Sequence, residues 1–217
     1  MEFLRRWGAR EDAGRRGSAR RWVVIDTETT GLDPQTDALL AIGGVAVDDA
    51  GIRATDSFEV VVRHNGEIAA SNIIVHGLGR ETIGAGVAPA VALDALRHWT
   101  NGAPCFAFHA EFDRRVLDRA AMLAGVSRLA GPWMDLAPLA ALLYPDVPRT
   151  GGGALDDWLS ALRIACASRH NAASDALASA ELLLALRSMA ATQGARRFDE
   201  LEALTKHRRW LGDRRSF

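Results

Sequence analysis

The stretch WVVIDTETTGLDP, residues 22–34, decides how this sequence is interpreted. Its apolar start runs directly into Asp26, and Glu28 follows two positions later. Side chains at positions i and i+2 share one face of a strand, so both carboxylates are expected on one face at the end of a buried strand. Two acids there are costly unless they are solvated or hold a cation, and such oxygen ligands suit Mg²⁺ or Mn²⁺. An exposed acidic turn, favoured by Asp33-Pro34, is the alternative.

Two further acids stand at comparable places later in the chain. In FHAEFDRRVL, Asp113 lies in the first turn of a helix that follows an apolar strand, where a surface ion pair with Arg114 or Arg115 is the alternative. In HNAASDALASAELLLAL, Asp175 shares the buried face of a helix with Leu182. His170 precedes Asp175 by five residues and is otherwise read as a cap or surface residue. A carboxylate on a buried helical face needs a partner, and a metal ion fits that need.

Composition and charge place this chain among globular proteins. It has 217 residues, 48% of them hydrophobic and 24% charged, and no apolar run approaches the roughly 18 residues of a membrane helix. The first residues lack the apolar region of a signal peptide. The two cysteines make no disulfide framework, so a reducing cytoplasm is expected.

The charge is unevenly distributed along the chain. Residues 1–21 hold seven Arg against three acids, and residues 196–217 hold seven basic residues against four acids. Subtraction from the totals of 26 and 27 leaves 12 basic and 20 acidic residues in 22–195. The basic ends are either solvated surfaces or segments that help to hold a polyanion near an acidic, metal-loaded centre.

Hydrophobic periodicity and turn signals predict three antiparallel strands, then alternating helices and strands, then helices. This order predicts an α/β fold with a mixed sheet flanked by helices. We expect residues 1–20 to form a frayed extension and residues 64–87 to be irregular. The Gly43-Gly44 pair predicts a bulge or a close approach of backbones. Strands are expected over 22–26, 38–47, 52–63, 103–108 and 132–134, and helices over 88–100, 111–124, 136–143, 154–163, 172–191 and 197–211.

The four carboxylates define a candidate chemistry. Four such groups can hold two divalent ions about 3.5–4 Å apart, of which one activates a water for attack on a phosphodiester and the other stabilises the leaving oxygen. His170 is suited to take the proton of that water because the ordinary pKa of imidazole is near neutrality.

The three stretches VIDTETTGLDP, FHAEFDRRVL and HNAASDAL resemble, in this order, the three motifs of the DEDDh 3′–5′ exonucleases, a DnaQ-like family that includes proofreading epsilon subunits of bacterial DNA polymerase III. The resemblance implies a ribonuclease H-like fold of about five strands and two Mg²⁺ or Mn²⁺ ions. It implies an exonuclease domain over 21–191, between a basic N-terminal extension, 1–20, and a basic helical C-terminal extension, 192–217. The implied metal ligands are Asp26, Glu28, Asp113 and Asp175, and His170 matches the general base.

The resemblance also implies where the 3′ end of a nucleic acid binds. The residues expected to contact the terminal nucleotide are Thr29, Gly31 and Leu32, with His76 of IIVHGLGRE as a further contact. Where the family commonly has His-Asn before the second-motif acid, this chain has Phe108 and His109. The substrate contact of that Asn is therefore expected either to be lost or to be replaced by one from His109. For Asp135, in WMDLAPLA, a structural or supporting role is expected.

The expected activity is hydrolysis of single-stranded or frayed 3′ ends, with release of nucleoside monophosphates and with DNA favoured over RNA. A haloacid-dehalogenase-type phosphatase is an alternative reading of Asp-Thr-Glu-Thr-Thr, but the only lysine, Lys206, lies in the terminal helix. A metal-free, catalytically silent binding module is a second alternative. Within the exonuclease class, a proofreading subunit with a polymerase partner and a stand-alone repair or RNA-processing nuclease both remain open.

Overall fold

A five-stranded mixed sheet forms the centre of the computed structural model, which describes residues 21–66, 77–147 and 153–213, with side chains to residue 206. The strand order is β3-β2-β1-β4-β5. Strand β1 pairs antiparallel with β2 and parallel with β4, so the predicted mixed sheet is confirmed. The strands are β1 Trp22–Thr29, β2 Leu39–Asp48, β3 Gly51–Val61, β4 Cys105–Ala107 and β5 Trp133–Asp135.

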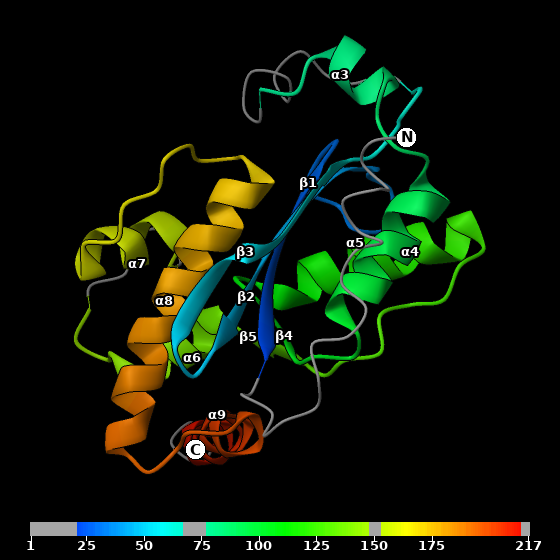
Figure 1. Cartoon of the computed structure of the whole chain (residues 1–217). Helices are drawn as coiled ribbons and strands as arrows, with labels where there is room; N and C mark the ends of the chain where they lie inside the picture. The colour runs from blue at the N-terminus through cyan, green and yellow to red at the C-terminus, as the bar shows by residue number, and fades with distance from the viewer. Residues whose placement is uncertain (1–20, 67–76, 148–152, 214–217) are drawn as a thin grey trace.

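Helices cover both faces of this sheet (Figure 1). Helix α8 lies across β1 and β2 on one face, with α6, α7 and α9 beside it, and α4 and α5 cover the other face. The helices are α3 Arg80–Gly84, α4 Pro89–Thr100, α5 Ala110–Ala124, α6 Leu136–Leu143, α7 Leu155–Leu162, α8 Ala172–Thr192 and α9 Phe198–Asp213. Because both faces of the sheet are covered, nearly every residue of β2 is buried, as in strands of layered α/β proteins.

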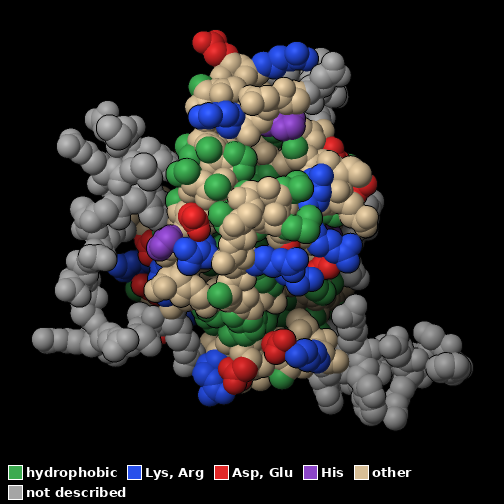
Figure 2. All heavy atoms as spheres, turned by 90° about the vertical axis from the view of Figure 1, so that its right-hand side faces the viewer, with side chains coloured by type: hydrophobic (Ala, Val, Ile, Leu, Met, Phe, Trp, Pro, Cys, Tyr) green, Lys and Arg blue, Asp and Glu red, His purple; other side chains and the backbone are tan. Residues whose placement is uncertain are grey.

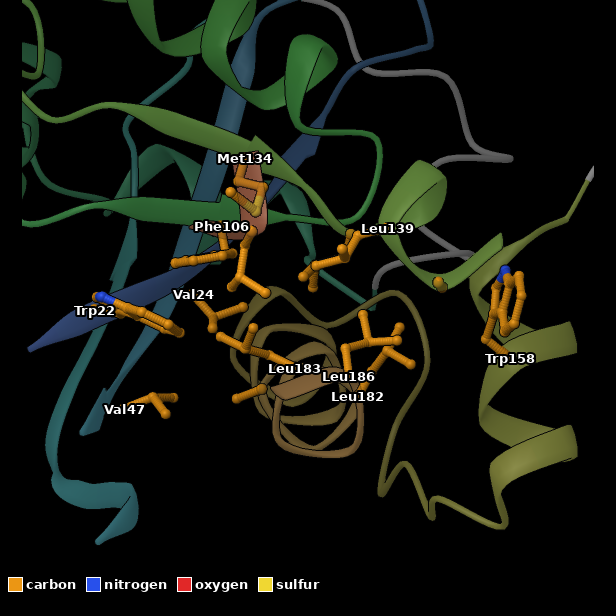
Figure 3. Packing of buried hydrophobic residues seen from close by; sticks show 14 of the residues in the cluster. Trp22, Val24, Val47, Phe106, Met134, Leu139, Trp158, Leu182, Leu183 and Leu186 are labelled. Atoms are coloured by element: carbon orange, nitrogen blue, oxygen red, sulfur yellow. The ribbon is translucent and has the colours of Figure 1, made fainter. Parts of the chain in front are cut away.

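Alternation along β1 divides the core in two. Trp22 and Val24 belong to the cluster on the α8 side, whereas Val23 and Ile25 belong to the cluster on the α4 and α5 side. Figure 3 shows the first cluster, in which side chains from β1 meet leucines of α8 such as Leu183. The same alternation places Asp26 and Glu28 on the α8 side of the strand.

The observed elements agree with the predicted ones to within about two residues at each end, except at two places. Strand β1 continues to Thr29 instead of ending at residue 26, because its pairing with β2 extends to Leu39. Asp26 and Glu28 therefore lie inside the paired strand and not beyond its end. The segment 64–87, predicted as irregular, contains α3 over Arg80–Gly84, a helix too short for periodicity to detect.

The Gly43-Gly44 pair makes the close approach that its sequence predicts. A Cβ at Gly43 would collide with the backbone of Ala172 and Ala173 at the start of α8. A Cβ at Gly44 would lie 2.8 Å from the ring of Trp99 in α4, on the opposite face. The two glycines thus let one helix approach each face of the same strand, and Gly43 pairs with Asp26 in the sheet register.

Helix α9, near the C-terminal end of the described chain, packs against the core. Leu201 of α9 is buried in the α8-side cluster, and Phe198 packs edge-on against Phe106 of β4 at a centroid distance of 5.6 Å. The predicted extension 1–20 lies outside the described residues.

On the surface seen in Figure 2, charged side chains of both signs surround hydrophobic ones. None of the helices in the described segments is long and apolar enough to cross a membrane.

Candidate active site

Strand β1 and helix α8 bring three carboxylates together. Asp26 and Glu28 project from the α8 side of β1, and Asp175 projects from the first turn of α8. One ligand oxygen from each of these three residues lies within 4.8 Å of the other two. All three donors are carboxylates, a set that suits Mg²⁺ and Mn²⁺. The described residues therefore fit the divalent-ion site that the sequence predicts.

The start of α8 is fixed by local interactions. Asn171 is the N-cap, and its Oδ1 accepts a hydrogen bond of 3.0 Å from the backbone N–H of Ser174. Because Gly43 leaves room for the backbone at Ala172, this helix end can lie directly against β2. Asp175, only 4% exposed, is thereby held beside Asp26.

Asp175 has its own set of partners. Its Oδ2 accepts a hydrogen bond of 2.9 Å from the backbone N–H of His170, and the thiol of Cys166 lies 3.4 Å from its Oδ1. Nη1 of Arg169 forms an ion pair with the same Oδ1. The loop before α8 thus supplies both a backbone donor and a cation to this buried acid.

Asp113 is buried at the other side of the sheet. It lies in the first turn of α5, is 4% exposed, and its Oδ1 accepts a hydrogen bond of 2.8 Å from the hydroxyl of Thr27. Thr27 lies between Asp26 and Glu28 in β1 and points to the opposite face. Asp113 is therefore not a member of the group formed by the other three acids, although its charge acts on Asp26.

Burial and mutual repulsion shift the acids toward their neutral forms. Burial, followed by repulsion from Asp113, Asp175 and Glu28, raises the pKa of Asp26 well above its ordinary value. Burial also raises the pKa of Glu28 to about 7, and the charge of Asp175 adds to this rise while Arg169 opposes it. A bound divalent cation would favour the charged forms, which is the protonation state that a metal ligand requires.

A third raised pKa belongs to Asp113. Its burial raises the pKa to about 7, against the hydrogen bond from Thr27, which favours the charged carboxylate. Shifts of this size in a group of neighbouring acids are a feature of functional sites.

His170 lies at the edge of this group. It is exposed, adopts a positive φ of 59°, and is tied to Asp175 through its backbone N–H. A non-glycine residue in the left-handed region is uncommon, and the capping of α8 by the next residue, Asn171, accompanies this conformation. The structure thus brings the backbone of His170 into contact with Asp175, and the predicted role of the imidazole stays a prediction.

The predicted substrate-contacting residues after Glu28 lie at the end of β1 and in the loop that follows it. Thr29 is buried and its hydroxyl donates to the carbonyl oxygen of Gly31 at 2.5 Å. A Cβ at Gly31 would collide with the carboxylate of Asp37, which accepts a hydrogen bond of 2.9 Å from Thr30. Leu32 is 91% exposed, so this large apolar side chain is available for contact.

The remaining predicted contacts lie elsewhere. His109 is the N-cap of α5, with φ of 60°, and its backbone N–H donates to Oδ1 of Asp135 at 2.9 Å. The same oxygen caps α6 by accepting from Ala137, also at 2.9 Å. Asp135 thus joins the starts of two helices, which is the structural role expected for it. His76 lies outside the described residues.

Sequence reasoning misses three contributors to the site. Thr27 carries no signal of its own because a hydroxyl between two acids resembles any strand residue, yet it holds Asp113. The sequence does not single out Cys166 and Arg169, because they lie in the loop before the third motif. The position of Arg169 directly before His170 is the available signal for a cation at the site.

Solved structures of two exonucleases resemble the fold of this chain. The structure resembles Exonuclease X in complex with 5′-overhanging duplex DNA, with a TM-score of 0.66, 21% identity and coverage of 85% of this chain and 99% of that one. It also resembles E. coli Exonuclease I in complex with a dT13 oligonucleotide, with a TM-score of 0.67, 14% identity and coverage of 78% of this chain and 41% of that one. These likenesses confirm the predicted ribonuclease H-like fold.

Sequence comparison names the family. Residues 23–183 match the exonuclease family (RNase_T), so the chain belongs to that family, and the predicted DnaQ-like 3′–5′ exonuclease relationship is confirmed. The DNA polymerase III subunit epsilon-like protein of Rhodobacter capsulatus is 31% identical over 196 residues, which are 88% of this chain and 27% of that protein. The PolC-type DNA polymerase III of Thermotoga petrophila is 26% identical over 84% of this chain and 13% of its own length.

The chain is much shorter than these relatives. It spans about a quarter of the length of the first of them and about an eighth of the second. Family and fold exclude the haloacid-dehalogenase-type phosphatase that the Asp-Thr-Glu-Thr-Thr stretch left as an alternative.

Proposed function

We propose that this chain is a divalent-metal-dependent 3′–5′ exonuclease that hydrolyses phosphodiester bonds at nucleic-acid 3′ ends and releases nucleoside monophosphates. The observation that carries this proposal is the convergence of Asp26, Glu28 and Asp175 within 4.8 Å in a member of the exonuclease family. Buried acids with raised pKa values that share one small volume gain most from a divalent cation.

The four acids have distinct proposed roles in a two-metal arrangement. When bound, Mg²⁺ or Mn²⁺ would supply an activated water and neutralise charge on the leaving oxygen. Asp26, Glu28 and Asp175 are proposed to hold the ions directly. Asp113 is proposed to join them from the α5 side, where the hydrogen bond from Thr27 fixes its orientation.

His170 is the proposed general base, which takes the proton from the attacking water. Its exposure leaves the imidazole accessible to solvent and substrate, and its backbone contact with Asp175 keeps it at the edge of the carboxylate group. Replacing His170 with Ala should lower kcat by about 10²–10⁴-fold, the usual contribution of general base catalysis, without weakening metal binding. Rate assays and Mn²⁺ titration calorimetry test this, with His98→Ala as an exposed control; equal losses in rate and metal affinity would exclude the role.

The 3′ end is proposed to bind over the loop Thr29, Gly31 and Leu32, with His109 and His76 as further contacts. The packing of Thr29 on Gly31 makes this loop a defined surface, and exposed Leu32 offers an apolar contact to a base. DNA is the favoured substrate, because the similar structures of Exonuclease I and Exonuclease X contain a dT13 oligonucleotide and 5′-overhanging duplex DNA.

The wider role is proposed from the relatives. The epsilon-like and PolC-type proteins support action beside a DNA polymerase, with a polymerase as partner, and a stand-alone nuclease is the competing role. In either role the proposed catalytic unit is residues 21–191, with the basic segments 1–20 and 192–217 as accessory regions and with the cytoplasm as the proposed location.

Degradation of 5′-labelled substrates tests the function. Single-stranded DNA, duplex DNA and RNA of one sequence are digested side by side with Mn²⁺, with Mg²⁺ and with EDTA. Shortening from the 3′ end that EDTA abolishes and either metal restores is the expected result, with single-stranded DNA digested fastest. Persistence of all three substrates at high enzyme concentration would support the catalytically silent alternative.

A further inference from the structure

Arg169 places a guanidinium beside the three carboxylates. It directly precedes His170, and its side chain is 28% exposed. Nη1 forms the ion pair with Oδ1 of Asp175, and Nε contacts Oδ1 of Asp156 in the first turn of α7 at 2.5 Å. Arg169 therefore bridges one acid inside the site and one acid outside it, since Asp156 is 63% exposed.

The charge of Arg169 acts on the whole group of acids. Its positive charge opposes the rise in the pKa of both Asp26 and Glu28, and it pairs directly with Asp175. Three carboxylates within 4.8 Å repel one another strongly in a partly buried site, so a neighbouring cation stabilises their charged forms. Arg169 thus places a positive charge of the chain itself beside the acids that are expected to bind a divalent ion.

The contact between Arg169 and Asp175 joins the buried Nη1 of the guanidinium to Oδ1 of the carboxylate. A guanidinium binds carboxylates best as a planar fork with two parallel hydrogen bonds. The contact with Asp175 joins one nitrogen to one oxygen, and a divalent ion that binds Asp175 would compete for that carboxylate.

We propose that Arg169 exchanges partners when the site is loaded. Without metal, its guanidinium neutralises Asp175; once a divalent ion binds the acids, the guanidinium leaves Asp175, stays tethered by Asp156 and binds a phosphate of the nucleic acid. The first half concerns metal binding alone, and the second half rests on the proposed function. Planar guanidinium donors match phosphate oxygens, and Asp156 keeps the side chain within reach after the exchange.

Metal titration tests the first half. Mn²⁺ is titrated by calorimetry into the full chain and into Arg169→Gln, without nucleic acid. Removing a cation that repels the ion and competes for Asp175 should tighten Mn²⁺ binding by about tenfold. Arg163→Gln is the matched control, because Arg163 is exposed and six positions away, and it should leave the affinity unchanged. Equal or weaker Mn²⁺ binding by Arg169→Gln would overturn the exchange.

Thermal unfolding distinguishes the proposed exchange of partners by Arg169 from an ion pair that has only a structural role. In EDTA, Arg169→Gln should lower Tm because the three acids lose their counter-charge, and saturating Mn²⁺ should remove the difference from the unmodified chain. A purely structural role predicts the same loss in both conditions, and that outcome would overturn the proposal.

Product binding tests the second half. Thymidine 5′-monophosphate is titrated into Mn²⁺-saturated protein, so no hydrolysis is needed. Arg169→Gln should weaken its binding by about tenfold, Arg169→Lys should recover only part of the loss, and Asp156→Asn should weaken it less than Arg169→Gln. Unchanged binding in Arg169→Gln would exclude the phosphate contact. Failure of the proposed exonuclease activity itself would appear separately, as intact substrate with the unmodified chain while the Mn²⁺ result stands.

Discussion

On one face of β1, Asp26 and Glu28 meet Asp175 from α8, whereas on the other face Thr27 meets Asp113 from α5. The acids on the α8 face carry like charges within 4.8 Å, and Arg169 is the cation paired with them. The acid on the α5 face is buried to the same extent as Asp175 but accepts a hydroxyl hydrogen bond of 2.8 Å.

This difference shows two ways of burying a carboxylate. A neutral hydrogen bond partly compensates a single buried acid, because it replaces one interaction lost with water. In the group of acids, Asp175 also accepts a hydrogen bond from the backbone N–H of His170, but hydrogen bonds leave the repulsion between like charges in place, so the group needs positive charge. The α8 face therefore depends on a cation, and the α5 face supplies an oriented acid to it.

Removal of an acid from the α8 face should have the largest effect. Asp26→Ala should lower exonuclease activity by at least about 100-fold, the scale on which one charge-stabilising contact to a transition state is lost. Its metal-free Tm should stay equal or rise, because the burial of Asp26 and its repulsion with Asp113, Asp175 and Glu28 are relieved. Rates on 5′-labelled DNA and thermal unfolding in EDTA measure both effects. Full retained activity would contradict the proposed site.

The glycine pair allows a matched comparison of the two faces. Gly43→Ala should push the start of α8 away from β2 and displace Asp175, which should lower activity by about 10²-fold, as expected for a misplacement near 1 Å. Gly44→Ala, the control, meets the ring of Trp99 on the other face. It should cost about 1–3 kcal/mol of stability with a smaller loss of activity. Equal losses of activity would mean that α8 is not specifically positioned by Gly43.

On the α5 face, removing the hydroxyl of Thr27 tests how much its hydrogen bond to Asp113 stabilises the fold. Thr27→Val keeps the side-chain shape but removes the hydroxyl donor to the buried carboxylate of Asp113, so the free energy of unfolding should fall by about 1–3 kcal/mol. Urea denaturation in EDTA measures this loss. The double variant Thr27→Val with Asp113→Asn should recover part of it, because a neutral amide costs less to bury; no recovery would argue that the threonine stabilises by packing alone.

The pH dependence of stability should show the smallest effect. The pKa of Glu28 is about 7 in the folded protein, compared with an ordinary value of 4.5, so the folded state binds more protons than the unfolded chain between these values. The free energy of unfolding contributed by Glu28 should therefore fall as the pH rises from about 4.5 to 7 and then level off.

Linkage gives at most roughly 3 kcal/mol for a rise from 4.5 to about 7, and solvent screening of the partly exposed Glu28 reduces this to about 1 kcal/mol. Tm in EDTA should therefore drop by about 2–4 °C more over this range for the unmodified chain than for Glu28→Gln. Saturating Mn²⁺ should reduce the difference, because a bound ion stabilises the charged carboxylate. Parallel pH profiles of the two proteins in EDTA would show that Glu28 keeps an ordinary pKa in the fold.

The sequence predicted the α8 face of the site better than its surroundings. Asp26 and Glu28 follow from period-2 alternation, and Asp175 follows from helical spacing with Leu182, so the faces on which they lie required only local geometry. Thr27 and Arg169 could not be assigned in this way. Their partners, Asp113 and Asp156, lie 86 and 13 positions away, and only the packed sheet and helices bring them into contact.

By itself, the sequence determined the order of strands and helices apart from α3, the exonuclease family and the faces on which Asp26, Glu28 and Asp175 lie, because these follow from local periodicity and short motifs. Only the tertiary structure decided that Asp113 is bound by Thr27 apart from the three-acid group, and that Arg169 pairs with Asp175. The physical reason is that the electrostatics of a buried charge depends on every group that packs around it, and that packing is not encoded in any one segment.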